Sequence, residues 1–354
     1  MTDIETRLIR LVQSGLTHTT LKKMLSLAAD DNGELSRLFT DKCNAKGIDG
    51  NCIEQLILKL KSEGEFQYIF DLWESGDLVD VKTLIEGENI YNILSPIDVS
   101  ESTKHFIASI TPPKNGIAKG IFEIISLAFF KDVNTSNLFY GTHHGDVHAG
   151  GLALEYKGPL ARISGTVAHP VYQEVTKLKE ILIDEYVWPA DYCIDNIYAG
   201  KKTSEHYFKS IVADLGGIEL TDNELFSIIL RSMIASHTDW LKYDTDIEAF
   251  TPHFDFFCRE VIKNPVKGII DGNALTRLRL ALNFKGYAED DKWDYLIGFK
   301  GKNGEDAIQN GDYIVISNED ARDLRYIYEH PNISYRGRGG SLEGRSQYVQ
   351  VIFT

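Results

Sequence analysis

The stretch Gly145-Asp146-Val147-His148-Ala149-Gly150-Gly151-Leu152-Ala153-Leu154-Glu155-Tyr156-Lys157 consists of two runs of residues on either side of a Gly-Gly pair. Such a pattern is typical of a β-hairpin with a two-residue turn. The predicted register has four facing pairs: Ala149 with Leu152, His148 with Ala153, Val147 with Leu154, and Asp146 with Glu155. Because side chains alternate between the two faces of a strand, Glu155 and Lys157 are expected on one face and Tyr156 on the other.

The predicted hairpin sets two carboxylates against each other. Facing residues of an antiparallel pair have Cβ atoms about 5 Å apart, and like charges at that distance are destabilising unless a positive group lies between them. Lys157 is one such group. A divalent cation is another, because carboxylate oxygens are the ligands that Mg²⁺ and Mn²⁺ prefer. The sequence therefore predicts that Asp146 and Glu155 hold Mg²⁺ or Mn²⁺.

A third acidic residue lies upstream, in a segment that is apolar nearly all round and is predicted to be a buried helix at 117–130. Glu123 is the only charged residue from 120 to 130. A buried carboxylate needs a cation or an ion-pair partner. Lys119, four residues earlier on the same helix face, is one candidate partner. The metal of the hairpin is the other candidate, and the facing carboxylates favour it.

The combination of Glu123, Asp146 and Glu155-Tyr156-Lys157 resembles the PD-(D/E)XK nuclease superfamily. Members of that superfamily carry an acidic residue on a core helix, an aspartate on one strand of a mixed sheet, and (D/E)-x-K on the next strand. The resemblance covers residues 116–170, with closing strands from the C-terminal region. Gly145 stands where the family pattern often has proline. The segment 116–123, followed by the hairpin, also resembles proteins of tailed bacteriophages.

This resemblance implies an α/β (α+β) fold with a restriction-endonuclease-like mixed sheet flanked by helices. It also implies hydrolysis of phosphodiester bonds in DNA, with Glu123, Asp146, Glu155 and Lys157 as the catalytic residues and the three acids as ligands of Mg²⁺ or Mn²⁺. The ion would polarise the scissile phosphate and lower the pKa of a bound water. Lys157 would orient that water or neutralise charge that develops in the transition state.

Four basic residues are predicted to contact the nucleic acid. Lys119 and Arg162 are candidates for the phosphate backbone, and the guanidinium of Arg162 suits bidentate contacts. Arg336 and Arg338 lie in the glycine-rich stretch 335–340, which is predicted to be flexible and basic. This stretch either lies along a nucleic-acid strand or is a plain loop between the two terminal strands, and the sequence leaves both open.

Three alternatives remain open. His143, His144 and His148 could form a site for Zn or Fe together with Asp146, because imidazole suits these metals. The core could instead be a non-catalytic scaffold in a larger assembly such as a phage particle, since fold alone does not establish activity. It could also be a restriction-type enzyme whose helical insertion reads a specific sequence.

The chain lacks the Gly-Asn-His-Asp/Glu run of calcineurin-like phosphoesterases, a phosphate-binding P-loop and a GxSxG elbow.

Apolar spacing and glycines predict an N-terminal all-α domain at 1–90, interpreted as a packing or oligomerisation module. Prolines mark 91–115 as a connector. Residues 116–354 are predicted to form the nuclease-like α/β domain, with a large helical insertion at about 171–284. After the insertion, the pattern predicts a helix at 319–330 and four strands, at 293–299, 312–317, 333–335 and 347–353.

The composition of the 354-residue chain is ordinary for a globular protein, with 43% apolar and 25% charged residues. The four cysteines are scattered, which predicts reduced thiols. No apolar run approaches 20 residues, so no membrane partner is expected. The start of the chain does not resemble a leader, and the predicted location is the cytoplasm, or the host cytoplasm or virion for a phage protein. The net charge is −15, but residues 61–100 hold nine acidic against two basic residues, whereas 101–170 hold five against six. A local basic channel is therefore compatible with DNA as a partner. A homodimer or virion-assembly partners are further expectations.

Overall fold

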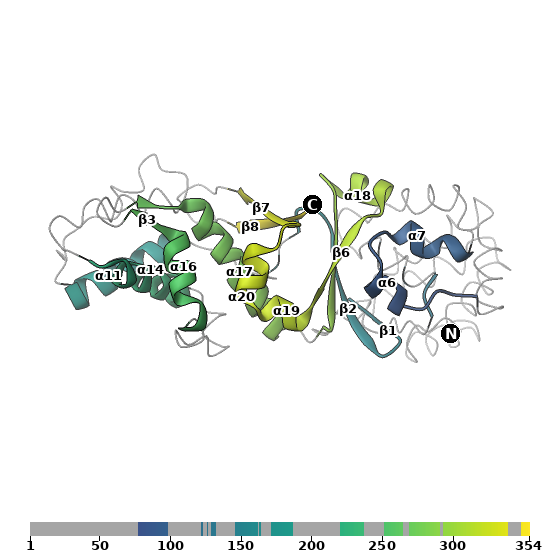
Figure 1. Ribbon diagram of the computed structural model, residues 1–354, viewed down its shortest axis with the longest axis horizontal. Helices are drawn as coiled ribbons and strands as arrows, with labels where there is room; N and C mark the ends of the chain where they lie inside the picture. Colours follow the sequence, from purple (N-terminus) through teal and green to yellow (C-terminus); the bar gives the residue numbers. More distant parts are fainter. Residues whose placement is uncertain are drawn as a thin grey trace, which may run out of the picture. The chain divides into compact units, whose positions relative to one another are not determined.

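The computed structural model in Figure 1 describes residues 77–97, 122, 126, 129–131, 146–161, 163, 171–186, 220–236, 251–264, 269–290, 293–338 and 348–354. The chain divides into two compact units. Unit 1 comprises Met1–Pro159, Asp291–Asn318 and Phe353–Thr354, and unit 2 comprises Leu160–Asp290 and Glu319–Ile352. Most of the predicted helical domain at 1–90 and of the predicted connector at 91–115 lies outside the described residues, so the predicted domain boundaries stay predictions.

A tight β-hairpin forms where the Gly-Gly pair predicts it. The strands β1 (Val147–Ala149) and β2 (Leu152–Lys157) pair antiparallel, with Ala149 opposite Leu152, His148 opposite Ala153 and Val147 opposite Leu154. Gly150 and Gly151 have φ values of 56° and 81°. Both central residues of a type I′ turn adopt this left-handed conformation, which glycine reaches without strain. The predicted register is confirmed for these three pairs.

The hairpin belongs to a four-stranded mixed sheet with the order β1-β2-β5-β6, of which Figure 1 labels β1, β2 and β6. The strand β5 (Tyr295–Phe299) runs parallel to β2, and β6 (Tyr313–Ser317) runs antiparallel to β5. Parallel neighbours need a long crossover connection, and here the chain from 158 to 294 provides it. The predicted α/β class with a mixed sheet is thus confirmed, and so are the predicted strands at 293–299 and 312–317.

Each face of this sheet carries its own row of side chains. The register places Glu155, Leu296 and Ile316 next to one another on one face, named the Glu155 face below. It places Tyr156, Ile297 and Val315 on the other, named the Tyr156 face. The apolar residues Leu296, Ile297 and Ile316 have no exposed surface, so both faces of the central strand are buried.

Short helices of unit 1 are tied to the β6 side of the sheet. They are α6 (Lys82–Glu86), α7 (Ile90–Leu94), the 3-10 turn η1 (Ser95–Ile97) and α18 (Gly304–Asn310). The side chain of Asn89 caps α7 by accepting the N–H groups of Tyr91 and Asn92, and it donates to the carboxylate of Asp312. The Tyr313 hydroxyl donates to the carbonyl oxygen of Leu84 at 2.7 Å. Burial raises the pKa of Tyr313, which therefore stays a neutral donor.

The remaining elements are mostly helical. They are α11 (Val171–Tyr186), α14 (Asp222–Ser236), η3 (Thr251–His253), α16 (Phe254–Val261), β3 (Ile262–Asn264), β4 (Ile269–Ile270), α17 (Gly272–Asp290), α19 (Asn318–Arg322), α20 (Leu324–Glu329), β7 (Ile333–Arg338) and β8 (Tyr348–Phe353). In unit 2, α11 packs against α14, and Arg231 of α14 forms an ion pair with Glu185 of α11. None of the described helices is both long and apolar enough to cross a membrane.

The structure differs from the sequence prediction in three respects. The helix expected at 319–330 is two helices, because the carboxylate of Asp323 accepts the N–H groups of Arg325 and Tyr326 and so starts α20. The short antiparallel pair of β3 and β4 was not predicted within the helical segment 171–284. The strands β7 and β8 form their own two-stranded sheet, whereas β5 and β6 are the strands that close the hairpin sheet.

Candidate functional site

Glu155 and Lys157 form an ion pair on the Glu155 face of β2. The Nζ atom of Lys157 lies 2.5 Å from Oε1 of Glu155, and the side chains of the lysine and the glutamate are 18% and 7% exposed. The E-x-K spacing explains the pairing, because residues two apart in a strand point to the same side. In the register, Glu155 lies beside the fully buried Leu296. A carboxylate in such surroundings needs a cation, since an uncompensated buried charge costs several kcal/mol.

Asp146 lies directly before β1, and its carboxylate reaches the backbone of β2. Its Oδ2 atom accepts the N–H of Tyr156 at 2.9 Å, while its own N–H donates to the carbonyl oxygen of Leu154 at 2.8 Å. The peptide nitrogen of Tyr156 is bonded to the carbonyl carbon of Glu155. The carboxylate of Asp146 is therefore held beside the backbone of Glu155.

The prediction that Asp146 faces Glu155 as a fourth pair of the ladder needs a correction. The last pair is Val147 with Leu154, and β1 begins only at Val147. The reason is the side chain of Asp146, which takes the Tyr156 N–H that a further backbone pair would use. A side chain-to-backbone hydrogen bond therefore holds the carboxylate of Asp146 at the peptide unit that follows Glu155.

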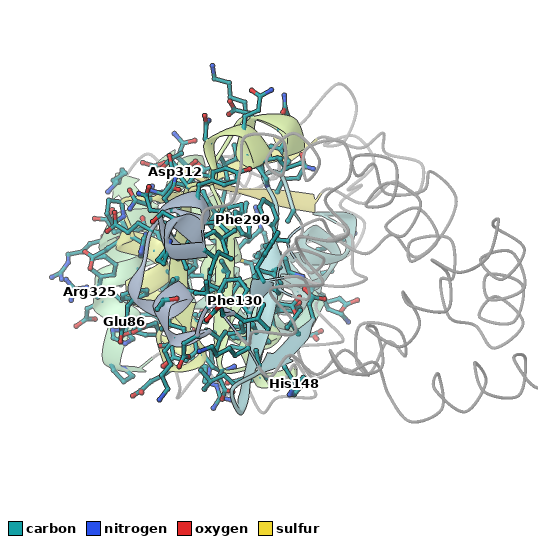
Figure 2. The ribbon with its side chains drawn as sticks, turned by 90° about the vertical axis from the view of Figure 1, so that its right-hand side faces the viewer. Glu86, Phe130, His148, Phe299, Asp312 and Arg325 are labelled. Carbon is teal, nitrogen blue, oxygen red and sulfur yellow. The ribbon has the colours of Figure 1, made fainter. Side chains whose placement is uncertain are left out.

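The opposite face of the sheet contacts the segment that contains Glu123. The Tyr156 hydroxyl lies 2.6 Å from Oγ of Ser126, and the ring of Phe122 stacks on Phe299, which Figure 2 labels among the packed side chains of the sheet. Phe122 and Ser126 thus contact the Tyr156 face, whereas Glu155 and Lys157 lie on the Glu155 face. Glu123 itself lies outside the described residues, so its place in the site stays a prediction.

The other predicted site residues are only partly described. Lys119 and Arg162 lie outside the described residues, as do His143 and His144. Arg336 and Arg338 were predicted in a flexible loop, but their backbone belongs to the strand β7, which ends at Arg338. His148 is half-buried opposite Ala153, near the tip of the hairpin (Figure 2).

Sequence reasoning missed Asp294, which holds the start of β2 against β5. Its Oδ2 atom accepts the N–H of Ala153, and its N–H donates to the carbonyl oxygen of Ala153, both at 2.8 Å. Its carbonyl oxygen also accepts the N–H of Asn318 at 2.9 Å. An aspartate directly before an apolar strand was the available signal. Asp294 fixes the parallel register that sets Glu155 beside Leu296.

Sequence reasoning also missed Gly298, which lies beside Lys157 in the register. A Cβ atom at this position would lie 2.7 Å from three ring carbons of Phe353. The aromatic ring therefore fills the space over Gly298 on the Glu155 face. A glycine here lets the sheet and the last residue of β8 approach each other closely.

The donor set of Asp146 and Glu155 consists of carboxylate oxygens, which suit Mg²⁺ or Mn²⁺ and not a soft metal. Mg²⁺ is commonly bound through one or two protein carboxylates, with water and substrate phosphate completing its shell. Within the part of the chain that the structure describes, no three His, Cys, Asp or Glu side chains are grouped to hold a metal ion. The chain matches no protein-family model, no curated protein and no solved structure.

Proposed function

We propose that this protein is a metal-dependent nuclease that hydrolyses phosphodiester bonds in DNA with Mg²⁺ or Mn²⁺. The observation that carries the proposal is the Glu155–Lys157 pair on one face of β2, with the carboxylate of Asp146 held at the next peptide unit. An aspartate directly before one strand of a hairpin and E-x-K on the other strand, within a mixed sheet, agree with the resemblance to PD-(D/E)XK nucleases.

Each residue of the site has a distinct role in this proposal. Asp146 and Glu155 are the ligands of the divalent ion, with Glu123 as a third acid from the preceding helical segment. When bound, the ion would supply Lewis acidity and a water of lowered pKa. Lys157 neutralises negative charge on the phosphate in the transition state. Lys119, Arg162, Arg336 and Arg338 are proposed contacts to the phosphate backbone.

The finer features of the fold belong to the same proposal. The antiparallel hairpin that continues into a parallel neighbour supports a restriction-endonuclease-like sheet. The described helices α11, α14 and α16 support a helical insertion between the hairpin and the closing strands. The N-terminal all-α domain at 1–90 is part of the proposal through the sequence pattern alone.

Cleavage assays test the proposal directly. The purified protein is incubated with linear, supercoiled and single-stranded DNA, and with RNA, in the presence of Mg²⁺, Mn²⁺ or EDTA. The variants Asp146→Asn, Glu155→Gln and Lys157→Gln are expected to lose at least about 100-fold in kcat/KM, because metal and charge stabilisation each supply several kcal/mol and 1.36 kcal/mol corresponds to a factor of ten.

Lys285→Gln is a matched control for this assay. Lys285 pairs with Glu289 at the same 2.5 Å distance and has the same 18% exposure as Lys157, but it lies on α17 outside the proposed site. It should cleave DNA like the wild type. Metal-dependent cleavage that survives in Asp146→Asn and Glu155→Gln would contradict the assignment of the site.

A non-catalytic assembly role is the second candidate function. It is favoured by the burial of the Glu155–Lys157 pair, whose side chains expose little surface to a substrate. In this case the pair only holds the fold together. Absence of cleavage on every substrate, together with a melting temperature that does not respond to Mg²⁺ or Mn²⁺, would support this function over the nuclease.

A further inference from the structure

The ammonium of Lys157 occupies the place beside the Glu155 carboxylate where a bound metal ion would lie. Its ammonium lies 2.5 Å from Oε1 of Glu155 on a face where the glutamate side chain is only 7% exposed. At that distance and burial, the lysine is the positive partner of the carboxylate. The carboxylate therefore already has a cation in the protein as described.

An ammonium and a divalent ion cannot both lie at bonding distance from the same carboxylate oxygen without strong repulsion. The repulsion is poorly screened because water has little access to the pair, whose side chains are only 18% and 7% exposed. Either cation satisfies the buried charge. The two are therefore alternatives for Oε1 of Glu155.

We propose that Lys157 is an exchangeable counter-ion of Glu155: it gives up Oε1 to a divalent cation, and its released ammonium then becomes available to a phosphate group of the substrate. This inference rests on the proposed function and adds to it a coupling between metal binding and the position of Lys157. The lysine neutralises Glu155 in the absence of metal and neutralises phosphate in its presence.

The position of Lys157 at the end of β2 allows its side chain to move after release. Lys157 is the last residue of β2, and its side chain is 18% exposed, against 7% for that of Glu155. Glu155, in contrast, lies inside the strand, paired in register with Leu296. Exchange therefore moves the long lysine side chain and leaves the carboxylate in place.

Amine labelling of the wild-type protein tests the exchange without any substitution. The full chain is acetylated briefly with and without saturating Mn²⁺, and the modification of each lysine is quantified by mass spectrometry. Lys157 should become several-fold more reactive with Mn²⁺, because a paired and mostly buried ammonium is released. Lys285, which has the same pairing distance and exposure, should not change. Unchanged or reduced labelling of Lys157 would overturn the proposal.

Metal affinity provides the second test. Mn²⁺ binding is measured by isothermal titration calorimetry for the wild type, Lys157→Met, Lys157→Gln and the control Lys285→Gln. Removing the competitor should tighten the Mn²⁺ dissociation constant about tenfold or more, since the fraction of carboxylate free to bind rises. The control should bind like the wild type. Equal or weaker binding by both Lys157 variants, or no binding by any protein, overturns the proposal.

These outcomes separate the exchange from the nuclease proposal. Cleavage that depends on Asp146 and Glu155, without any tightening in the Lys157 variants, refutes the exchange alone. Tighter Mn²⁺ binding in the variants, with no cleavage of any nucleic acid by the wild type, supports the exchange and refutes the nuclease. If Lys157→Met does not fold without metal, Lys157→Gln and the labelling of the wild type still decide.

Discussion

At Gly298, one missing side chain allows an aromatic ring to pack beside the proposed site. Alanine at this position would place its Cβ 2.7 Å from three ring carbons of Phe353. The ring is rigid and only 1% exposed, so it cannot move away cheaply. We expect Gly298→Ala to lower the free energy of unfolding by about 1–3 kcal/mol, the usual cost of overpacking. Urea unfolding followed by circular dichroism measures this change.

Gly158 provides the control for that substitution. Nothing that the structure describes lies within 4 Å of a Cβ at Gly158, so Gly158→Ala should change the free energy of unfolding by less than about 1 kcal/mol. Adding Phe353→Leu to Gly298→Ala should recover part of the loss, because the smaller side chain relieves the clash. Equal effects of alanine at both glycines would show that steric contact with Phe353 is not the cause.

The thiol of Cys258 shows how burial controls reactivity at a single residue. Cys258 is a free cysteine of α16 with 4% exposure, and burial raises its pKa to about 11. Because the fold favours the neutral thiol, its contribution to stability is complete below the unfolded pKa of about 8.5 and is lost as the pH rises through about 11. We therefore expect no alkylation of Cys258 by iodoacetamide at pH 8 in the native protein. Peptide mapping by mass spectrometry checks this, and rapid labelling at pH 8 without denaturant would contradict it.

At the scale of elements, the hairpin was the most predictable feature. Two glycines between alternating runs fix both the turn and the register, and the three pairs that follow from them are present. Asp146 departs from the pattern because its side chain competes for a backbone donor, and alternation of faces carries no information about such a bond. The same kind of local hydrogen bond, from Asp323, splits the helix expected at 319–330. Short polar side chains at element ends are thus where the periodic pattern fails.

The turn itself yields a prediction at this scale. Gly151 has φ at 81° and open space around its Cβ position, so a substitution there meets only the backbone penalty. Gly151→Ala should lower the free energy of unfolding by about 1–2 kcal/mol, and Gly151→Asn by less, because asparagine tolerates the left-handed region. Chemical denaturation of the two variants measures the order. An alanine variant as stable as the wild type would contradict the assigned turn.

At the scale of the whole molecule, the sheet joins segments that are far apart in the chain. The hairpin ends at Lys157 and its parallel neighbour begins at Tyr295. The sequence predicted both segments as strands, but not which strand would lie beside β2. The hydrogen bonds between Asp294 and Ala153 support that choice, and single-sequence periodicity does not report on such long-range pairs. The candidate acids were therefore predictable, whereas the residues that hold their strand were not.

The division into two units leads to a last prediction, about which segments exchange their amide hydrogens more slowly when metal binds. Asp146, Glu155 and Lys157 all belong to unit 1, and α14 and α16 belong to unit 2. A bound ion stabilises the segments that it links, so backbone amides of 146–158 should exchange more slowly with Mn²⁺. Amides of α14 and α16 should exchange at the same rate with and without the ion. Hydrogen–deuterium exchange read by mass spectrometry measures both sets in one sample, with Asp146→Asn as the control that abolishes the effect. Slowing confined to α14 and α16, or slowing that persists in Asp146→Asn, would place the ion outside the hairpin.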